Sequence, residues 1–200
     1  MTGPIPTGIF GGSFNPIHRA HIDLAETIVG QGWVKELWLM VTPHNPLKHS
    51  QDLWPDDLRL ELARIATQRH PHIHVCDLEY HLPRPSYTFQ TLTTLTRLHP
   101  DRRFHLVIGG DNWACFDRWK HWEEIIQRYP LIIYPRPDAP IDPATLPPGA
   151  RLIDAPLHPI SSTAIREALR RGEPVSQWLD CEVEQRIRAF LHEKHTGTIV

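Results

Sequence analysis

Two histidines lie three residues apart just after a glycine turn near the start of the chain. Gly11 and Gly12 follow a short apolar segment, and His18 and His21 come where the apolar spacing becomes helical. Because residues three apart share one face of a helix, the two imidazoles should lie side by side. The first turn of a helix offers unpaired N–H groups and the positive end of its dipole, so an anion is favoured there. The pattern predicts a phosphate site in which both imidazoles donate hydrogen bonds.

A second cluster of hydroxyl and cationic side chains lies at residues 161–166, which read Ser-Ser-Thr-Ala-Ile-Arg. Hydroxyl groups at the start of a helix accept hydrogen bonds from its free N–H groups, and this capping role alone would explain Ser161 and Ser162. The apolar residues of this helix are four apart and face the core, which turns Arg166 away from the apolar side. A guanidinium in that position can bind phosphate oxygens.

The elements that must position these side chains alternate along the chain. Short apolar segments without polar alternation are typical of strands that are covered on both faces. Strands that alternate with helices predict an α/β fold with a doubly wound parallel sheet, which binds ligands at the carboxyl ends of its strands. The predicted strands are residues 7–10, 36–41, 73–77, 104–108, 131–134 and 151–154, and the predicted helices are residues 17–29, 56–69, 88–98, 161–171 and 175–193.

The length and composition fit one globular domain. The chain has 200 residues, of which 40% are hydrophobic and 22% are charged. We therefore expect residues 1–200 to form a single domain, with a C-terminal helical part at about 161–193. The net charge of −2 argues against a general nucleic-acid or membrane-surface binder, which would carry a basic excess. A small anionic ligand needs only a local basic patch, and a homo-oligomer is compatible with this composition.

The cysteines do not form a disulfide or zinc pattern. Cys76, Cys115 and Cys181 are odd in number and widely spaced, with no C-x-x-C pair, which fits a reducing compartment. The first residues do not form a charged and then apolar leader, and no run approaches the ~18 apolar residues that a membrane span needs. We therefore expect a cytoplasmic protein.

The turn before the two histidines carries a family resemblance. Gly-Gly-Ser-Phe-Asn-Pro at 11–16 and His-Arg-Ala-His at 18–21 resemble the H-x-G-H motif of the nucleotidyltransferase superfamily, in which a strand, a turn and a helix hold the triphosphate of ATP. Ala20 stands where glycine is usual, which adds one methyl group near the nucleotide. The resemblance implies ATP contacts from Gly11, Gly12, Ser13, Phe14, His18 and His21.

Later segments resemble the bacterial nicotinate-nucleotide adenylyltransferases, and the likeness extends from Gly8 to about Leu191. Residues 160–166 match the I-S-S-T-x-I-R motif, which closes over the β- and γ-phosphates of ATP in that family. A buried strand ends in Gly-Gly-Asp at 109–111, where the resemblance favours an ATP contact, although the acid could instead cap the next helix. The resemblance thus adds ATP contacts from Gly109, Asp111, Ser161, Ser162, Thr163 and Arg166.

Four further residues are implied to bind the second substrate. Pro-Ser-Tyr-Thr at 85–88 resembles the segment whose N–H groups receive the nicotinate carboxylate, although Thr88 could also be the N-cap of its helix. Trp119 corresponds to the aromatic residue that stacks on the pyridine ring. Lys48 and Arg136 correspond to phosphate-binding cations, and the family's usual P-P-H-K spelling is replaced before Lys48 by Asn-Pro-Leu.

The implied activity is transfer of the adenylyl group of ATP to nicotinate mononucleotide, which gives deamido-NAD and pyrophosphate in NAD biosynthesis. His18 and His21 would donate to phosphoryl oxygens, and Arg166 would neutralise the departing pyrophosphate. Mg²⁺ is expected to arrive with ATP, because the sequence shows no carboxylate cluster suited to a magnesium site built by the protein alone.

Two other interpretations remain open from the sequence. A sister enzyme could adenylylate nicotinamide mononucleotide or phosphopantetheine, although residues 85–88 and Trp119 favour a pyridine ring. A histidine-rich metal-binding protein is a different class, since the chain has 14 histidines and an H-x-x-H pair fits half of a metal site. We interpret the alternating histidines at 70, 72 and 74 as solvated, and the proline-rich residues 135–148 as a surface loop.

Overall fold

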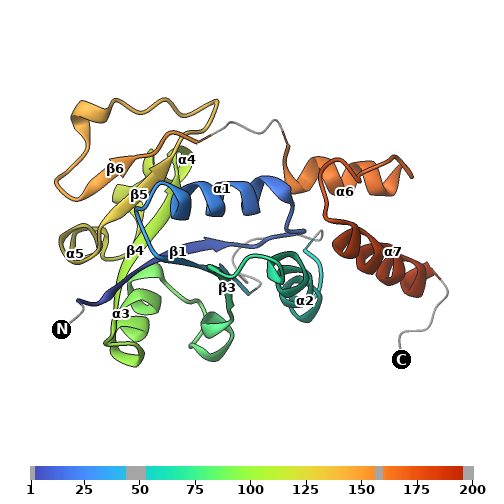
Figure 1. Cartoon of the computed structure of the whole chain (residues 1–200), viewed down its shortest axis with the longest axis horizontal. Coiled ribbons are helices and arrows are strands. Elements are labelled where there is room, and N and C mark those ends of the chain that lie inside the picture. Colours follow the sequence, from blue (N-terminus) through green and yellow to red (C-terminus); the bar gives the residue numbers. More distant parts are fainter. Residues whose placement is uncertain (1–2, 44–52, 156–159, 196–200) are drawn as a thin grey trace.

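A computed structural model describes residues 3–43, 53–155 and 160–195, and a sheet of six parallel strands lies at its centre (Figure 1). All six predicted strands are present, with ends that differ from the predicted ones by at most two residues. The strands are β1 (Ile5–Gly12), β2 (Glu36–Val41), β3 (Ile73–Cys76), β4 (Arg102–Gly109), β5 (Leu131–Tyr134) and β6 (Ala150–Leu152).

The strand order is β3-β2-β1-β4-β5-β6, and every neighbouring pair is parallel. The chain therefore adds β2 and β3 on one side of β1, and then adds β4, β5 and β6 on the other side. In such sheets the crevice for a ligand opens at the carboxyl ends of the two strands where the direction changes. The register pairs Phe10 with Val107, so the glycine-rich ends of β1 and β4 emerge on the same edge. The predicted doubly wound parallel sheet is confirmed.

The five predicted helices are also present, and α5 and the short α4 are elements that the sequence pattern did not reveal. Both are only one or two turns long, too short for an apolar stripe to repeat. The helices are α1 (Arg19–Gly30), α2 (Asp56–Thr67), α3 (Thr88–Leu98), α4 (Gly110–Trp113), α5 (Trp122–Arg128), α6 (Ser162–Arg170) and α7 (Cys181–His195), and the 3₁₀ turns are η1 (Leu78–His81), η2 (Phe116–Arg118) and η3 (Pro143–Thr145).

The predicted start of the last helix at residue 175 is wrong, because α7 begins six residues later. Val175 is fully buried in the core, which explains why it fits the apolar pattern of the predicted helix, but residues 176–178 form a turn. The Asp180 carboxylate accepts a hydrogen bond from the N–H of Glu182 at 2.9 Å, as an N-cap side chain does. None of the helices within the described residues is long and apolar enough to cross a membrane.

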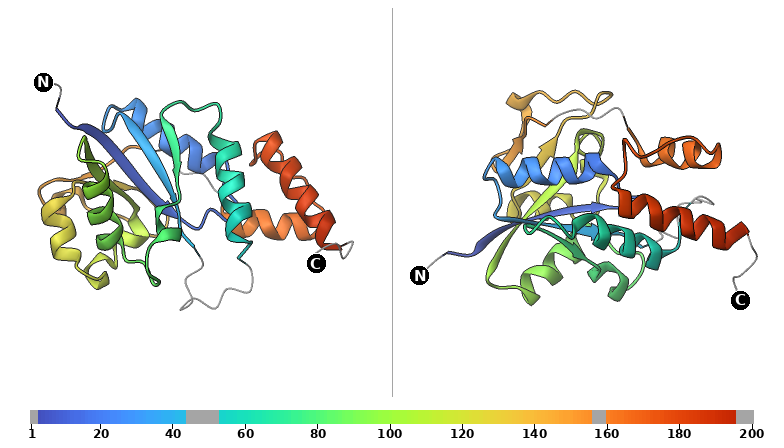
Figure 2. Two further views of the ribbon diagram at one scale, coloured as in Figure 1. Left: turned by 90° about the horizontal axis from the view of Figure 1, so that it is seen from below. Right: turned by 45° about the vertical axis from the view of Figure 1, so that its right-hand side comes forward.

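Successive side chains along each strand point to opposite faces of the sheet and pack into two apolar clusters, one on each face. Phe10 packs into the cluster that includes residues of α1, α2, α6 and α7, whereas its neighbour Ile9 packs into the cluster that includes α3 and α5. Helix α7 lies beside α2, as both views in Figure 2 show. The last two helices therefore extend the apolar cluster that includes α1 and α2 and lie beyond the carboxyl end of β1, where α6 contacts the turn after that strand (Figure 1).

Candidate active site

Two adjoining cavities open at the carboxyl edge of the sheet. The larger has a volume of about 660 Å³ and the smaller about 160 Å³, and Phe10, Tyr134 and Ser162 line both. The larger cavity brings together many of the residues predicted from the sequence, namely Gly11, Gly12, Ser13, Thr88, Gly109, Trp119, Ser162, Thr163 and Arg166. The smaller cavity is lined by His18, His21, Arg136 and Ser161, together with Ala20.

The turn after β1 is held in an unusual backbone conformation at Phe14. This residue has φ of 42°, a left-handed value that a side chain disfavours, and its ring is buried edge-on against Phe10 at 5.5 Å between centroids. The ring also closes the space over Gly12, where a Cβ atom would lie 3.1 Å from it. Phe14 thus shapes the loop from behind, and it lines neither cavity.

The two histidines lie together as predicted, although His18 is the N-cap of α1 rather than part of its first turn. Their rings stack with 3.7 Å between centroids, and the N–H of His18 donates to Nδ1 of His21 at 3.2 Å. Burial, with smaller contributions from His18 and Arg136, lowers the pKa of His21 well below its usual value. His21 is therefore neutral at pH 7, and because Nδ1 accepts a hydrogen bond, Nε2 carries the proton.

Helix α6 begins with two serines that have different roles. The hydroxyl of Ser161 accepts from the N–H of Ala164 at 3.2 Å, so its capping role is confirmed. The hydroxyl of Ser162 instead donates to the carbonyl of Pro16 at 2.9 Å. This bond attaches the start of α6 to the turn that leads into α1.

Arg166 strengthens the same junction. Its Nη1 atom donates to the carbonyl of Asn15 at 2.7 Å, and its Nη2 atom lies 3.3 Å from the hydroxyl of Thr163. Both Arg166 and Thr163 line the larger cavity. The two phosphate-type motifs, which lie at opposite ends of the sequence, therefore meet at one cavity.

The end of β4 is closely packed against two polar side chains. A Cβ atom at Gly109 would collide with the carboxylate of Asp111, which would have to move, and would lie 3.0 Å from the Tyr134 ring. The interpretation of Asp111 as a helix cap is wrong, because Gly109 is the N-cap of α4. Asp111 instead lies 3.6 Å from Nε of Arg136, whose Nη2 atom donates to the Tyr134 hydroxyl at 3.3 Å. Asp111 itself lines neither cavity.

The residues predicted to bind the second substrate are only partly described. Thr88 is the first residue of α3 and Tyr87 is its N-cap, so the capping interpretation of Thr88 is wrong. Trp119 is half-buried against Phe116, with 5.1 Å between ring centroids, and lines the same cavity as Thr88. Lys48 lies outside the described residues.

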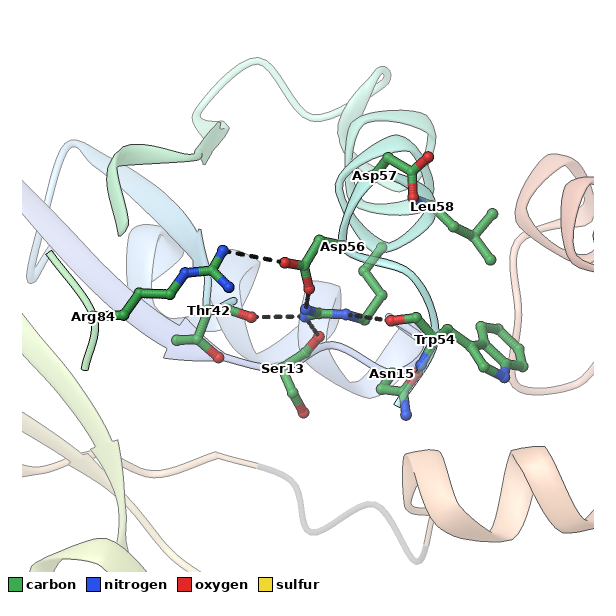
Figure 3. Close-up of polar contacts among 9 residues, drawn as sticks. Ser13, Asn15, Thr42, Trp54, Asp56, Asp57, Leu58 and Arg84 are labelled. Atoms are coloured by element: carbon green, nitrogen blue, oxygen red, sulfur yellow. Dashed lines mark hydrogen bonds and ion pairs between the residues drawn. The ribbon is translucent and has the colours of Figure 1, made fainter. Parts of the chain in front are cut away.

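Sequence reasoning missed a buried arginine on α2. The side chain of Arg59 is 0% exposed and donates to the carbonyls of Ser13 at 2.6 Å and Thr42 at 2.8 Å (Figure 3). It also donates to the carbonyl of Trp54 at 3.2 Å and pairs with Asp56 at 2.5 Å. A signal was present, because this arginine lies beside the apolar stripe of the predicted helix at 56–69 and a solvated charge does not belong there.

Two more cavity residues were also missed. Arg84 lines the larger cavity and lies 3.4 Å from the second carboxylate oxygen of Asp56 (Figure 3). Glu79 lines it as well, and its carboxylate accepts from the hydroxyl of Thr91 at 2.8 Å. Burial raises the pKa of Glu79. Isolated charges between turn residues gave no spacing pattern that could have identified either one.

The histidine-rich segment makes separate contacts with single carboxylates. His70 lies 2.7 Å from Glu26, and His74 lies 3.7 Å from Glu36. In the parts of the chain that the structure describes, no three His, Cys, Asp or Glu side chains are grouped so that they could hold a metal ion. The proline-rich residues 135–148 form the predicted loop, which contains the short η3 turn.

Comparisons with known proteins agree with this geometry. Residues 9–168 match a family described as cytidylyltransferase-like. The chain is 49% identical over 181 residues to a probable nicotinate-nucleotide adenylyltransferase of Bacteroides fragilis, covering 90% of each chain. It is 46% identical over 192 residues to the protein of the same name in Bacteroides thetaiotaomicron, covering 96% of this chain and 95% of that one.

The fold is similar to that of a solved structure titled Plasmodium falciparum nicotinic acid mononucleotide adenylyltransferase complexed with NaAD. The TM-score is 0.80 at 24% identity, and the match covers 93% of this chain and 96% of the other. A putative nicotinate-nucleotide adenylyltransferase from Vibrio parahaemolyticus matches with a TM-score of 0.68 at 21% identity, over 92% of this chain and 93% of that chain. These two likenesses concern the fold.

Proposed function

This chain belongs to the cytidylyltransferase-like family, and we propose that it transfers the adenylyl group of ATP to nicotinate mononucleotide, releasing deamido-NAD and pyrophosphate. The observation that carries the proposal is the junction between the turn after β1 and the start of α6. Ser162 and Arg166 bind carbonyls of that turn, and the histidine pair lies directly after it. Two helix starts that favour anions thereby face one site, as binding of a triphosphate requires.

The reaction requires the protein mainly to position the two substrates and to neutralise negative charge on the phosphoryl oxygens. An oxygen of the mononucleotide phosphate attacks the α-phosphorus of ATP, and the bond from that phosphorus to the bridging oxygen of pyrophosphate breaks. The attacking phosphate is already an anion at neutral pH, so no general base and no covalent enzyme intermediate are needed. Catalysis then comes from alignment of the two substrates and from donors aimed at the phosphoryl oxygens.

His21 is suited to donate a hydrogen bond without carrying a charge. Its lowered pKa keeps it neutral at pH 7, and the bond from the His18 N–H to Nδ1 leaves Nε2–H as the available donor. Such a donor can strengthen its bond as charge builds on the α-phosphoryl group. His18, stacked on it at 3.7 Å, fixes the orientation of the ring and supplies a second imidazole beside the same cavity.

Arg166 is placed to meet the departing pyrophosphate. Its bond to the Asn15 carbonyl fixes one side of the guanidinium plane, and the side chain lines the larger cavity. A guanidinium fixed in this way can bind two phosphate oxygens in parallel. Gly11, Gly12 and Ser13 line the same cavity and can bring main-chain groups close to the triphosphate, because two of the three have no side chain.

Mg²⁺ fits this site as an ion carried by the substrate. The described residues contain no group of three metal-binding side chains, so we place the ion on the phosphate oxygens of ATP. When bound, it neutralises part of the triphosphate charge. The protein's own contribution remains the imidazoles and the guanidinium around it.

The acceptor side of the larger cavity supports a pyridine mononucleotide. Trp119 offers an aromatic surface for a flat ring, and Ser86 and Thr88 line the cavity at the start of α3, where a helix has unpaired N–H groups. These features favour nicotinate mononucleotide over phosphopantetheine, which has no aromatic ring to stack. We also place the enzyme in the cytoplasm, where ATP is supplied and where its free cysteines remain reduced.

The test is an assay with separate acceptors. Purified protein, ATP and Mg²⁺ are incubated with nicotinate mononucleotide, nicotinamide mononucleotide or phosphopantetheine, and dinucleotide and pyrophosphate are measured. We expect equal amounts of deamido-NAD and pyrophosphate with the first acceptor. Pyrophosphate release with phosphopantetheine alone would show a different acceptor, and no release with any of the three would contradict the adenylyltransferase assignment.

A further inference from the structure

The Arg59 guanidinium is buried behind the turn after β1 and lines neither cavity. Arg59 is fully buried and does not line the larger cavity, whereas Ser13 and Thr42, whose carbonyls it binds, both line it. The guanidinium donates to these two carbonyls and to the carboxylate of Asp56, and Figure 3 labels the three residues that receive these bonds. One side chain of α2 thereby joins the end of β1, the end of β2 and the start of its own helix.

The bond to Ser13 determines which way the loop's main-chain donor points. The Ser13 carbonyl faces Arg59 at 2.6 Å, and the peptide between Ser13 and Phe14 is trans. In a trans peptide the N–H points opposite to the carbonyl, so the N–H of Phe14 points away from Arg59. A loss of the Arg59 bond would free this peptide to rotate.

The backbone conformation of the loop makes such rotation favourable. Phe14 has the left-handed φ of 42°, which a non-glycine residue holds only where its surroundings enforce it. The buried ring, packed against Phe10 and His21, helps to enforce it. The hydrogen bond of Arg59 holds the carbonyl of the preceding residue, Ser13.

The charges around Asp56 also favour an anion at this loop. The Asp56 carboxylate is shared by two guanidinium groups, Arg59 at 2.5 Å and Arg84 at 3.4 Å. The three side chains together carry one surplus positive charge behind and beside the loop. Arg59 is fully buried and Arg84 and Asp56 are partly exposed, so the surplus charge favours an anion near this loop and is partly screened by solvent.

We propose that Arg59 is a positioning residue for ATP, which holds the turn after β1 so that its main-chain N–H groups face the triphosphate. The inference rests on the proposed function, because it takes the ligand of this loop to be ATP. It assigns no contact between Arg59 and the substrate. We therefore expect loss of this side chain to weaken ATP binding more than a substitution elsewhere in α2 that lowers the free energy of unfolding by the same amount.

The experiment compares Arg59→Lys with Leu62→Ala. Lysine keeps the charge, but its single ammonium cannot span three carbonyls and a carboxylate as the planar fork does. Leu62 is fully buried one turn further along α2, and its truncation leaves a cavity that destabilises the fold without touching the loop. Melting temperatures, the Kd for α,β-methylene-ATP by calorimetry, and the kinetic constants are measured below both unfolding transitions.

We expect Arg59→Lys to raise the Kd for the analogue about tenfold and to lower kcat/KM for ATP about 100-fold, since small misplacements of reacting groups have effects of this size. Leu62→Ala should match the wild type within about twofold in both quantities at equal folded fraction. If both variants lose analogue binding to the same degree, or if neither does, Arg59 is a structural residue only. If the wild-type protein does not bind the analogue, the proposed function fails instead.

Asp56→Asn keeps the test decisive if Arg59→Lys does not fold. The Asp56 side chain is 31% exposed, so the amide is tolerated at its position, yet it loses the charge that orients both guanidinium groups. We expect kcat/KM for ATP to fall about fivefold, as removal of a charge-assisted bond predicts. An unchanged kcat/KM for ATP in this variant would overturn the proposal.

Discussion

The Arg166 guanidinium donates a 2.7 Å hydrogen bond to the main-chain carbonyl of Asn15, a residue 151 positions earlier in the chain. The bond joins α6 to the turn that follows β1. Because the Ser162 hydroxyl makes a second bond to the neighbouring carbonyl of Pro16, the start of α6 cannot move independently of that turn. The two motifs that we propose to bind phosphate are therefore joined to one another by two hydrogen bonds.

Replacement of Arg166 by alanine should impair the triphosphate site while leaving the protein folded. We expect kcat/KM for ATP to fall about 100-fold or more, because a charged donor to phosphate and a bond to the loop are lost together. The matched control is Arg171→Ala, which removes an exposed guanidinium just after the same helix, paired with Glu173 at 2.7 Å. Steady-state kinetics of both variants check this, and equal kinetics for Arg166→Ala and wild type would contradict the assigned role.

The variant His21→Ala should lower kcat by about 10²–10³, as loss of one preorganised donor does. ATP binding should weaken much less, since the bond gains strength mainly as charge develops. His72→Ala removes an exposed imidazole far from both cavities and serves as the control. Turnover and ATP affinity are measured separately, and full turnover by His21→Ala would show that the motif is not catalytic.

The acid group of the acceptor should be strongly preferred over the amide. If N–H groups near Thr88 meet this group, a carboxylate satisfies all of them, whereas an amide NH₂ leaves a donor unpaired at roughly 1–3 kcal/mol and loses the charge-assisted bond. We expect kcat/KM for nicotinate mononucleotide to exceed that for the amide by at least about 100-fold. An assay with equal concentrations of the two mononucleotides would reveal this preference. Equal use of both would contradict the assignment of nicotinate mononucleotide as acceptor, but not the adenylyltransferase activity.

The smaller cavity offers a test of where the rest of ATP lies. Ala20 lines this cavity of about 160 Å³, and leucine at position 20 would fill much of it. We expect Ala20→Leu to raise the KM for ATP about tenfold, since overpacking typically costs 1–3 kcal/mol, while the KM for nicotinate mononucleotide stays within about twofold. A rise in the second KM alone would place the acceptor in this cavity.

Stability should decrease below about pH 6.5. Burial lowers the pKa of His21 well below its usual 6.5 and, with Arg103 nearby, lowers that of His105 to about 4. Below pH 6.5 the unfolded chain therefore binds more protons than the folded one, so the free energy of unfolding falls as pH falls, by up to about 1.4 kcal/mol per pH unit for each histidine. Above pH 6.5 both contributions are constant.

Denaturant unfolding at several values between pH 7 and pH 5 measures this slope. The variants His21→Asn and His105→Asn should each show a shallower slope than wild type, whatever their stability at pH 7. An unchanged slope in both variants would show that neither group differs between the folded and unfolded states.

The sequence by itself determined the architecture and the chemistry of the two motifs. Apolar strands alternating with amphipathic helices predict a doubly wound parallel sheet, and the sheet formed with strand ends within two residues of the predicted ones. The three-residue spacing placed His18 and His21 close together at the start of α1, but their stacking also depends on the extended backbone of His18, which is the N-cap and not a helical residue.

Only the tertiary structure decided how distant groups are combined. Asp111 pairs with Arg136 instead of capping α4, because the end of β5 brings that arginine beside the end of β4. Arg59 holds the loop after β1 because α2 packs against the sheet beside β2. This packing buries the guanidinium among three main-chain carbonyls, to which it donates hydrogen bonds. Such bonds join residues tens of positions apart and depend on the packing of whole elements, for which spacing along one element carries no information.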